Sequence, residues 1–222
     1  DFFLVAFSVT ARRLSFADPA ISVPVRLRTK EKFSETQNNN IKTRLAWIDQ
    51  TRSSVEFARI CETNIDRVQE SNLAFKGRIT AVEVGADARN LRSPNSGKTC
   101  SLEADSIPLI VTSPPYGSAQ KYIRATSLSL NWLGFVKPKE LSSFEGKSIG
   151  REHVPFCRHE EIQERLPKAY EQLLLRVQGK NETRARITRQ YLHEMKVALS
   201  EMARVTSNGG RVRIVIGNRT VC

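Results

Sequence analysis

The sequence predicts an α/β domain whose sheet is largely parallel. A short apolar run at residues 107–111 has the composition of a strand that is buried on both faces, as in parallel sheets, and residues 79–84 are also expected to form a strand. A helical pattern over residues 181–205 precedes a third strand-like run at 212–216. Strands that alternate with helices in this way are typical of α/β proteins. With 222 residues, 40% of them hydrophobic and 26% charged, the chain can bury the core of such a domain.

The segment before this core is predicted to be helical at both ends. Apolar residues dominate 2–15, and those of 52–73 recur at helical spacing, so we expect two helices, the first of them buried. Pro19 and Pro24 indicate an extended connector between them. The polar run 28–42 indicates an exposed loop.

The remaining elements complete the expected organisation. In chain order we expect a helix over 118–133, an irregular segment over 136–158, a helix over 160–178 that Pro167 kinks or breaks, and a helix over 181–205 that Asn181 caps and Asn208-Gly209-Gly210 ends. The predicted domains are an N-terminal helix and connector over 1–50 and the α/β core over 51–222. Residues 136–178 are a candidate recognition insert on the basis of their position alone.

The charge of the chain indicates a polyanionic partner. Its 35 Lys and Arg residues outnumber 23 Asp and Glu residues, for a net charge of +12. Basic side chains bind nucleic acid by neutralising phosphates and releasing counterions, so a nucleic acid is the expected partner. A basic enzyme with no such partner is the alternative.

The cysteines and the N-terminal run bear on metal binding and location. The four cysteines form no CxxC pair, so no metal site is expected, and nothing indicates a disulfide framework. The apolar run at residues 2–7 is too short to cross a bilayer and lacks the basic flank of a signal peptide. A reducing cytoplasm is therefore the expected location, with no membrane partner.

The motif Ser-Pro-Pro-Tyr at 113–116 is the strongest functional signal. It follows an expected strand directly, and open α/β sheets bind ligands beyond the carboxyl ends of their strands. The two prolines have no N–H, so the turn offers carbonyl acceptors without competing donors. Tyr116 provides a ring that can stack on a base, and Gly117 permits close approach. The alternative is that the motif is only a rigid turn.

This combination suits methylation of an exocyclic base amine. The nitrogen lone pair is delocalised into the ring, so a site must accept hydrogen bonds from the amine and orient the base in line with the methyl donor. The hydroxyl of Ser113 and the carbonyl of Pro114 are the expected acceptors. A base inside a duplex would have to flip out to reach them.

The motif and its surroundings resemble the amino-methyltransferases of DNA, the N4-cytosine and N6-adenine methylases. The resemblance rests on residues 112–117 (Thr-Ser-Pro-Pro-Tyr-Gly), 122–124 (Tyr-Ile-Arg), 130–134 (Leu-Asn-Trp-Leu-Gly), 202–205 (Met-Ala-Arg-Val) and 209–212 (Gly-Gly-Arg-Val). It covers roughly residues 79–135 and 183–218. In that family the first motif is catalytic, and its Ser form is associated mainly with N4-cytosine.

The resemblance implies a Rossmann-like fold and S-adenosylmethionine as the cofactor. The implied residues are Ser113, Pro114, Pro115 and Tyr116 for catalysis, Asp87 and Thr112 for the cofactor, and Gly117, Lys121 and Arg124 for the substrate. Asp87 would lie near the adenosine, with a helix cap or turn residue as the alternative. Lys121 and Arg124 would hold phosphates that flank the flipped base, or else lie on a solvated helix face.

One family feature is missing. The glycine-rich cofactor loop of FxGxG type has no counterpart here, because the sequence contains no GxG. We expect that loop before Asp1, after Cys222 or in a partner chain, so the fold is incomplete at its cofactor end. Alternative functions are methylation of adenine N6, of an RNA base or of a glutamine side chain, and a non-catalytic DNA-binding or scaffold subunit that retains the fold.

Overall fold

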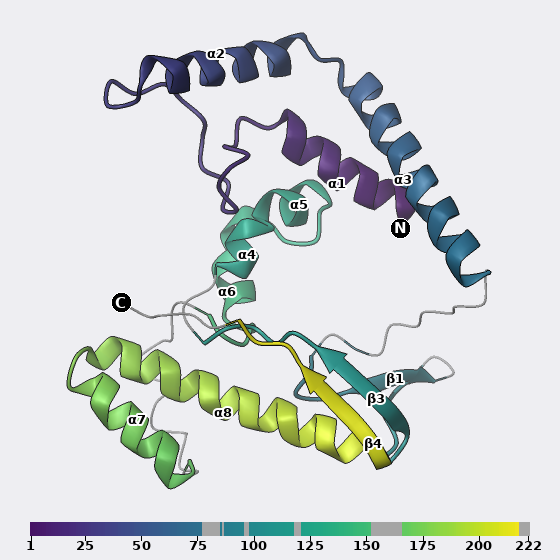
Figure 1. Ribbon diagram of the computed structural model, residues 1–222, viewed down its shortest axis with the longest axis vertical. Coiled ribbons are helices and arrows are strands. Elements are labelled where there is room, and N and C mark those ends of the chain that lie inside the picture. The colour runs from purple at the N-terminus through teal and green to yellow at the C-terminus, as the bar shows by residue number, and fades with distance from the viewer. Residues whose placement is uncertain (77–84, 86, 96–97, 118–120, 152–165, 218–222) are drawn as a thin grey trace. The chain divides into compact units, whose positions relative to one another are not determined.

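The computed structural model describes residues 1–222 except 77–84, 86, 96–97, 118–120, 152–165 and 218–222 (Figure 1). It divides into two compact units, each formed by two stretches of the chain. Unit 1 contains residues 1–80 and 121–144, and unit 2 contains residues 81–120 and 145–222. This division differs from the predicted domain boundary at residue 50, since residues 51–80 and 121–144 belong with the N-terminal helix.

Unit 1 is helical throughout its described secondary structure. Its elements are α1 (Phe2–Leu14), α2 (Glu35–Gln50), α3 (Ser53–Phe75), α4 (Tyr122–Ala125), α5 (Ser127–Trp132), the 3-10 turn η1 (Pro138–Glu140) and most of α6 (Leu141–Glu145). The two long helices expected at 2–15 and 52–73 are thus confirmed as α1 and α3. The helix expected over 118–133 is interrupted, because α4 ends at Ala125 and α5 starts at Ser127.

The prediction of an exposed loop over 28–42 is wrong from residue 35 onward. Ser34 starts α2 with a capping box, in which its hydroxyl accepts from the N–H of Gln37 and the Gln37 side chain accepts from the N–H of Ser34. Such a box satisfies two backbone donors that the first turn leaves open. The polar run Gln37-Asn38-Asn39-Asn40 therefore continues a helix that its local cap begins.

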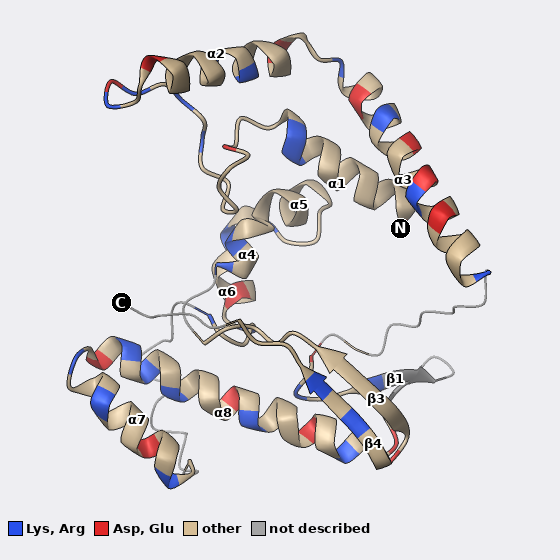
Figure 2. Ribbon diagram, viewed as in Figure 1, with Lys and Arg blue, Asp and Glu red and all other residues tan. Residues whose placement is uncertain are grey.

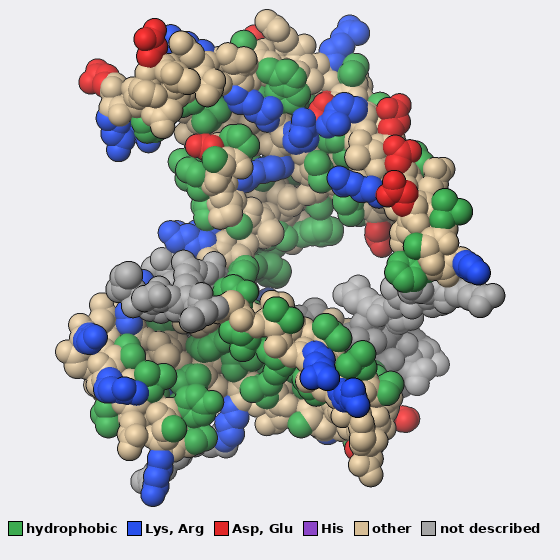
Figure 3. All heavy atoms as spheres, viewed as in Figure 1, with side chains coloured by type: hydrophobic (Ala, Val, Ile, Leu, Met, Phe, Trp, Pro, Cys, Tyr) green, Lys and Arg blue, Asp and Glu red, His purple; other side chains and the backbone are tan. Residues whose placement is uncertain are grey.

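Helix α1 packs on α3 and α5 within unit 1 through one face only. Ala6 is fully buried, the rings of Phe7 and Trp132 meet edge to face at 6.3 Å, and the hydroxyl of Ser8 donates to that of Ser129 at 2.7 Å. Its opposite side is open, with Val5 57% and Val9 40% exposed. The prediction of a buried first helix is therefore wrong for this face, and Figure 3 shows that apolar side chains reach the surface of both units.

A buried carboxylate joins α1 to α3. Glu56 is 5% exposed, and its oxygens accept from Arg13 at 2.5 Å and from Arg59 at 2.8 and 3.0 Å. The hydrogen bonds from Arg59, and then those from Arg13, lower the pKa of Glu56 to about 2 against the desolvation that opposes them. A carboxylate held in this way stabilises the fold only while it stays ionised.

We predict that unit 1 loses stability in acid because of Glu56. A folded pKa near 2 lies below the usual value of 4.5, so the stabilisation is complete above about pH 4.5 and is lost as the pH falls towards 2. The full shift corresponds to roughly 3 kcal/mol at one pKa unit per 1.36 kcal/mol. Fluorescence from Trp47 and Trp132, both in unit 1, would follow urea unfolding across this range. In Glu56→Gln the pH dependence should shrink, and an unchanged slope would refute the assignment.

In its described residues, unit 2 combines two pairs of strands with two helices. Strands β1 (Arg92–Asn95) and β2 (Lys98–Ser101) form an antiparallel hairpin, β3 (Ile107–Thr112) pairs in parallel with β4 (Thr206–Ile214), and α7 (Lys168–Gln178) packs on α8 (Glu182–Val205). The strand expected at 107–111 and the helix capped by Asn181 are confirmed, the cap accepting from the N–H of Arg184 at 2.9 Å. One described pair of strands is parallel and the other antiparallel, so the largely parallel sheet and the Rossmann-like fold both stay predictions.

Several expectations for unit 2 are corrected. Strand β3 is not buried on both faces, because Leu109 and Val111 are 54% and 68% exposed. The glycine pair 209–210 lies inside β4, because α8 passes at Val205 directly into the strand. Helix α7 begins after Pro167, so its described part is shorter than the expected 160–178. The strand expected at 79–84 and the whole of residues 152–165 lie outside the described residues.

The glycine pair produces an irregularity in the parallel ladder. Ile107 pairs with Thr206 but Leu109 pairs with Arg211, so three additional residues of β4 lie between the two contacts. Gly209 has a φ of +76°, which glycine adopts readily, and a Cβ on Gly210 would lie 2.7 Å from the carbonyl oxygen of Ser207. Glycine is required here to let β4 bulge while staying paired.

Figure 2 shows Lys and Arg spread over both units, and β4 carries Arg211 and Arg213. Within the described residues, no helix has the length and apolar composition needed to cross a membrane.

Candidate functional site

The Ser-Pro-Pro-Tyr motif lies at the carboxyl end of β3, as the sequence predicted. Thr112 ends the strand, pairs with Ile214, and accepts at its carbonyl from the N–H of Val215 at 2.9 Å. Ser113 follows and is exposed, whereas Pro114 is buried. Pro114 also favours an extended backbone at Ser113, which carries the chain away from the sheet. Ser113 is therefore the most exposed residue of the 113–117 turn.

Tyr191 of helix α8 contacts the motif at two of its residues. The Tyr191 hydroxyl donates to the carbonyl of Pro115 at 3.0 Å, although 76 positions separate the two residues. The Tyr191 ring also lies against Gly117, where a Cβ would come within 2.7 Å of its carbon atoms. No real Cβ fits at that distance, so glycine at 117 is required by Tyr191.

Two further glycines contact Tyr116 of the motif. A Cβ on Gly150, whose φ is +75°, would lie 3.0 Å from the Tyr116 carbonyl oxygen and 3.3 Å from Cβ of Pro115. A Cβ on Gly217, beyond β4, would lie 3.0 Å from the Tyr116 hydroxyl. Tyr116 is therefore packed at its backbone by one segment and at its ring by another, which leaves it half-buried.

Asp87 begins a turn that Asn90 closes, because the N–H of Asn90 donates to the Asp87 carbonyl at 3.0 Å. Its carboxylate accepts from the N–H of Arg89 at 3.0 Å and from the guanidinium at 2.8 to 3.1 Å. The side-chain hydrogen bond from Arg89 lowers the pKa of Asp87. Asp87 is therefore a turn residue, which was the alternative interpretation, and its contact with a cofactor stays a prediction.

A buried charged cluster connects this turn to α8. Glu194 is 7% exposed, and its Oε1 accepts from Arg151 at 2.6 Å and from Gln190 at 2.8 Å, with Arg89 at 3.5 Å. Arg151 is 3% exposed and also donates to the Ser148 carbonyl at 2.9 Å. Arg89 donates in addition to the Lys147 carbonyl at 2.9 Å. Charges therefore alternate in sign from Asp87 through Arg89 and Glu194 to Arg151.

Residues of α8 contact both the Ser-Pro-Pro-Tyr motif and the segment that carries Arg151. The 147–151 segment that Arg151 anchors is the same one whose Gly150 touches Tyr116. Asp87, through Arg89 and Glu194, and the 113–117 motif, through Tyr191, are both linked to α8, whereas Thr112 is bonded to β4 and Val215. Lys121 and Arg124 belong to unit 1, where Arg124 lies in α4, and their predicted phosphate contacts stay predictions.

Sequence reasoning missed the residues that support the motif. Tyr191 lies in an apolar helical stripe, so its pattern predicted a core residue, and nothing in the spacing marked its hydroxyl as a partner of Pro115. Gly150 and Arg151 fall in the segment expected to be irregular. The signal that was available is Gly150 itself, because glycine in a loop often marks a close backbone approach.

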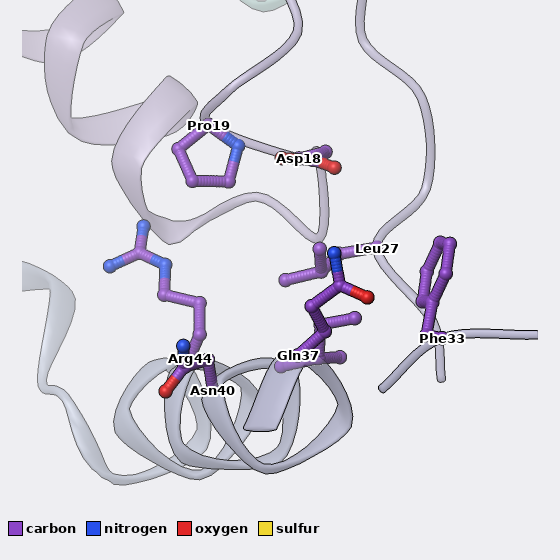
Figure 4. A pocket seen from close by; sticks show the side chains of 8 residues that line it. Asp18, Pro19, Leu27, Phe33, Gln37, Asn40 and Arg44 are labelled. Atoms are coloured by element: carbon purple, nitrogen blue, oxygen red, sulfur yellow. The ribbon is translucent and has the colours of Figure 1, made fainter. Parts of the chain in front are cut away.

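One cavity of unit 1 lies apart from these residues in the sequence. It has a volume of about 290 Å³ and lies between the 18–33 connector and α2, lined by Asp18, Pro19, Leu27, Phe33, Gln37, Asn40, Ile41 and Arg44 (Figure 4). Its polar groups are already engaged in part: Asp18 accepts from the N–H of Ala20, and Arg44 donates to the Arg13 carbonyl and lies over the Trp47 ring. None of the predicted site residues lines it.

Within the described residues, no three His, Cys, Asp or Glu side chains gather closely enough to bind a metal ion. Comparison with protein-family models, with curated proteins and with solved structures finds no match to this chain. The geometry of the 113–117 turn and its resemblance to the catalytic motif of DNA amino-methyltransferases are therefore the observations that bear on function.

Proposed function

We propose that the protein transfers a methyl group from S-adenosylmethionine to the exocyclic amine of a DNA base, cytosine N4 in the first place. One observation carries the proposal. An exposed serine, followed by a Pro-Pro turn, lies at the carboxyl end of a parallel strand and is fixed there by a long helix. Parallel α/β sheets bind their ligands at that edge.

The residues of the turn supply what the amine needs. The Ser113 hydroxyl accepts a hydrogen bond from the amine and turns the nitrogen lone pair towards the methyl donor. The Pro114 carbonyl provides a second acceptor, and no donor among the described residues competes for it. The half-buried Tyr116 ring offers a face on which a flipped base stacks. The chain forms no covalent bond with the base in this reaction.

Asp87 and Thr112 are the residues that would hold the cofactor. When bound, S-adenosylmethionine supplies an electrophilic methyl group on its sulfonium. The fit of Asp87 is partial, because Arg89 already occupies both carboxylate oxygens, so a ribose hydroxyl would have to share them. The missing glycine-rich loop would come from a segment or chain outside residues 1–222.

DNA is the proposed substrate because of the charge of the chain. A net charge of +12 attracts phosphates along the backbone of a nucleic acid, whereas base identity is left to the site. A reducing cytoplasm, where such an enzyme would meet DNA, remains part of the proposal.

We predict that Ser113→Ala reduces methyl transfer only partially, because the Pro114 carbonyl remains. Loss of one neutral hydrogen bond, about 0.5–1.5 kcal/mol, corresponds to a roughly two- to twelvefold slower chemical step with unchanged DNA affinity. Mass spectrometry of nucleosides from treated DNA would identify the product. N4-methylcytosine supports the proposal, N6-methyladenine changes the base but keeps the reaction, and RNA-only activity changes the substrate. The proposed function would be refuted if the unsubstituted protein, assayed together with the segment or chain that carries the glycine-rich loop, formed no methylated nucleoside.

The second candidate is a non-catalytic subunit that binds DNA and retains the fold. The closed Asp87–Arg89 pair favours it, together with the missing glycine-rich loop. Calorimetry with S-adenosylmethionine separates the two functions, because a scaffold subunit would bind DNA without binding the cofactor.

A further inference from the structure

We infer that Tyr191 of α8 is the positioning residue of the Pro-Pro turn, and that it determines which acceptors the base amine meets. The inference rests on the proposed function and extends it to a residue 75 positions beyond Tyr116. It does not require Tyr191 to touch the substrate.

The hydroxyl of Tyr191 occupies one of the two proline carbonyls. It donates to the Pro115 carbonyl at 3.0 Å, so this oxygen already has a partner. Two neighbouring carbonyls of one turn face different directions, and a base amine bound to the wrong one would present its nitrogen at the wrong angle. By bonding to Pro115, Tyr191 leaves Ser113 and Pro114 as the acceptors for the amine.

The ring of Tyr191 fixes the same turn from its other end. It fills the space where a side chain at 117 would stand, since a Cβ there would lie 2.7 Å from the ring. The turn is therefore held at position 115 by a hydrogen bond and at position 117 by contact. Tyr116, which lies between the two, is fixed in consequence, and its ring is the proposed stacking surface.

The rigidity of α8 makes this support effective. Glu194, one turn further along the helix, anchors the 147–151 segment through Arg151, and Gly150 of that segment packs on the Tyr116 carbonyl. Both flanks of the turn thus depend on one face of one 24-residue helix. Catalytic geometry is maintained best by residues on such regular elements.

Tyr191→Phe is the direct test, because it removes the hydroxyl and keeps the ring. In the protein supplied with the glycine-rich loop, single-turnover transfer to duplex DNA should slow by roughly three- to tenfold, the effect of one hydrogen bond. The KM for DNA and the melting temperature should change little. Tyr170→Phe on α7 is the matched control, since Tyr170 is a 46% exposed tyrosine of the same unit, and it should transfer at the original rate.

A pair of variants tests the contact with Gly117. Gly117→Ala should slow transfer at least tenfold in the original background, because its methyl group overlaps the ring. In a Tyr191→Ala background, where the ring is gone, the same change should slow transfer less than twofold further. Hydrogen exchange at the amides of residues 116 and 117 should be faster in Tyr191→Phe, and this readout needs no activity.

The outcomes separate the inference from the function on which it rests. If the unsubstituted protein methylates DNA and Tyr191→Phe does so at the same rate with unchanged exchange, Tyr191 does not position the turn. Equal losses from Gly117→Ala in both backgrounds would likewise overturn the inference. If the unsubstituted protein methylates nothing while the exchange still changes, the function is refuted and the structural support of the turn is retained.

Discussion

Replacing Glu194 by leucine is expected to destabilise unit 2 by about 3–5 kcal/mol, the usual cost of breaking a buried ion pair by removing one partner. Arg151 would remain 3% exposed without its carboxylate, and Arg89 would lose one of its two acidic neighbours. A loss of this size approaches the whole stability of many domains. Circular dichroism at the helical minimum would follow it, since α8 is the longest helix of the unit.

The double variant Glu194→Leu with Arg151→Met tests whether the loss comes from the buried charge that the single variant leaves unpaired. Because both charges are gone, no ion is left buried, and apolar side chains of similar size often restore or exceed the original stability. We expect it to recover at least half of the loss. Glu182→Leu serves as the control, because Glu182 is an exposed carboxylate of the same helix and should cost less than 1 kcal/mol. Equal losses at 182 and 194 would contradict the role given to the cluster.

Tyr116→Ala is expected to slow methyl transfer by roughly ten- to a hundredfold. Stacking of a base on an aromatic side chain contributes about 1–3 kcal/mol in nucleic-acid complexes, and the variant removes that surface from the proposed site. The ring also contacts the segment at Gly217, so the end of β4 would lose a neighbour.

Tyr116→Phe separates the contribution of base stacking on the ring from that of the contact near Gly217. It keeps the stacking face and removes only the hydroxyl that lies near Gly217, so it should retain most of the transfer rate. Single-turnover kinetics on duplex DNA and on DNA with a mismatched target base would measure both variants. The mismatch lowers the cost of flipping, so it should partly compensate Tyr116→Ala. Full activity of Tyr116→Ala on both substrates would remove Tyr116 from the site.

The sequence predicted the elements whose signals are local. Helix α8 was readable because Asn181 caps it and its apolar residues keep helical spacing, and β3 because five apolar residues precede the motif. The start of α2 was missed although its signal was also local, because the capping box at Ser34 and Gln37 was hidden in a polar run whose composition indicated a loop.

The support of the site depends on contacts between distant residues, which a single sequence does not reveal. The bond from Tyr191 to Pro115 and the pair of Arg151 with Glu194 join segments 76 and 43 positions apart. A tyrosine in an apolar stripe and a glutamate on a helix both have ordinary interpretations as core and surface. Their role becomes visible only when the fold brings the 113–117 turn over α8.

The parallel pairing of β3 with β4 also determines when the site can form during folding. The ladder pairs Ile107 with Thr206, so about a hundred residues must be synthesised between the two before the strands can pair. Long closures of this kind are slow relative to helix formation, because the entropy of the loop is lost before the pairing stabilises it. We therefore expect α8 to form early and the Ser113 turn to acquire its geometry late. A ribosome-bound chain that has not yet exposed Gly217 would carry the motif without the neighbour that packs on Tyr116.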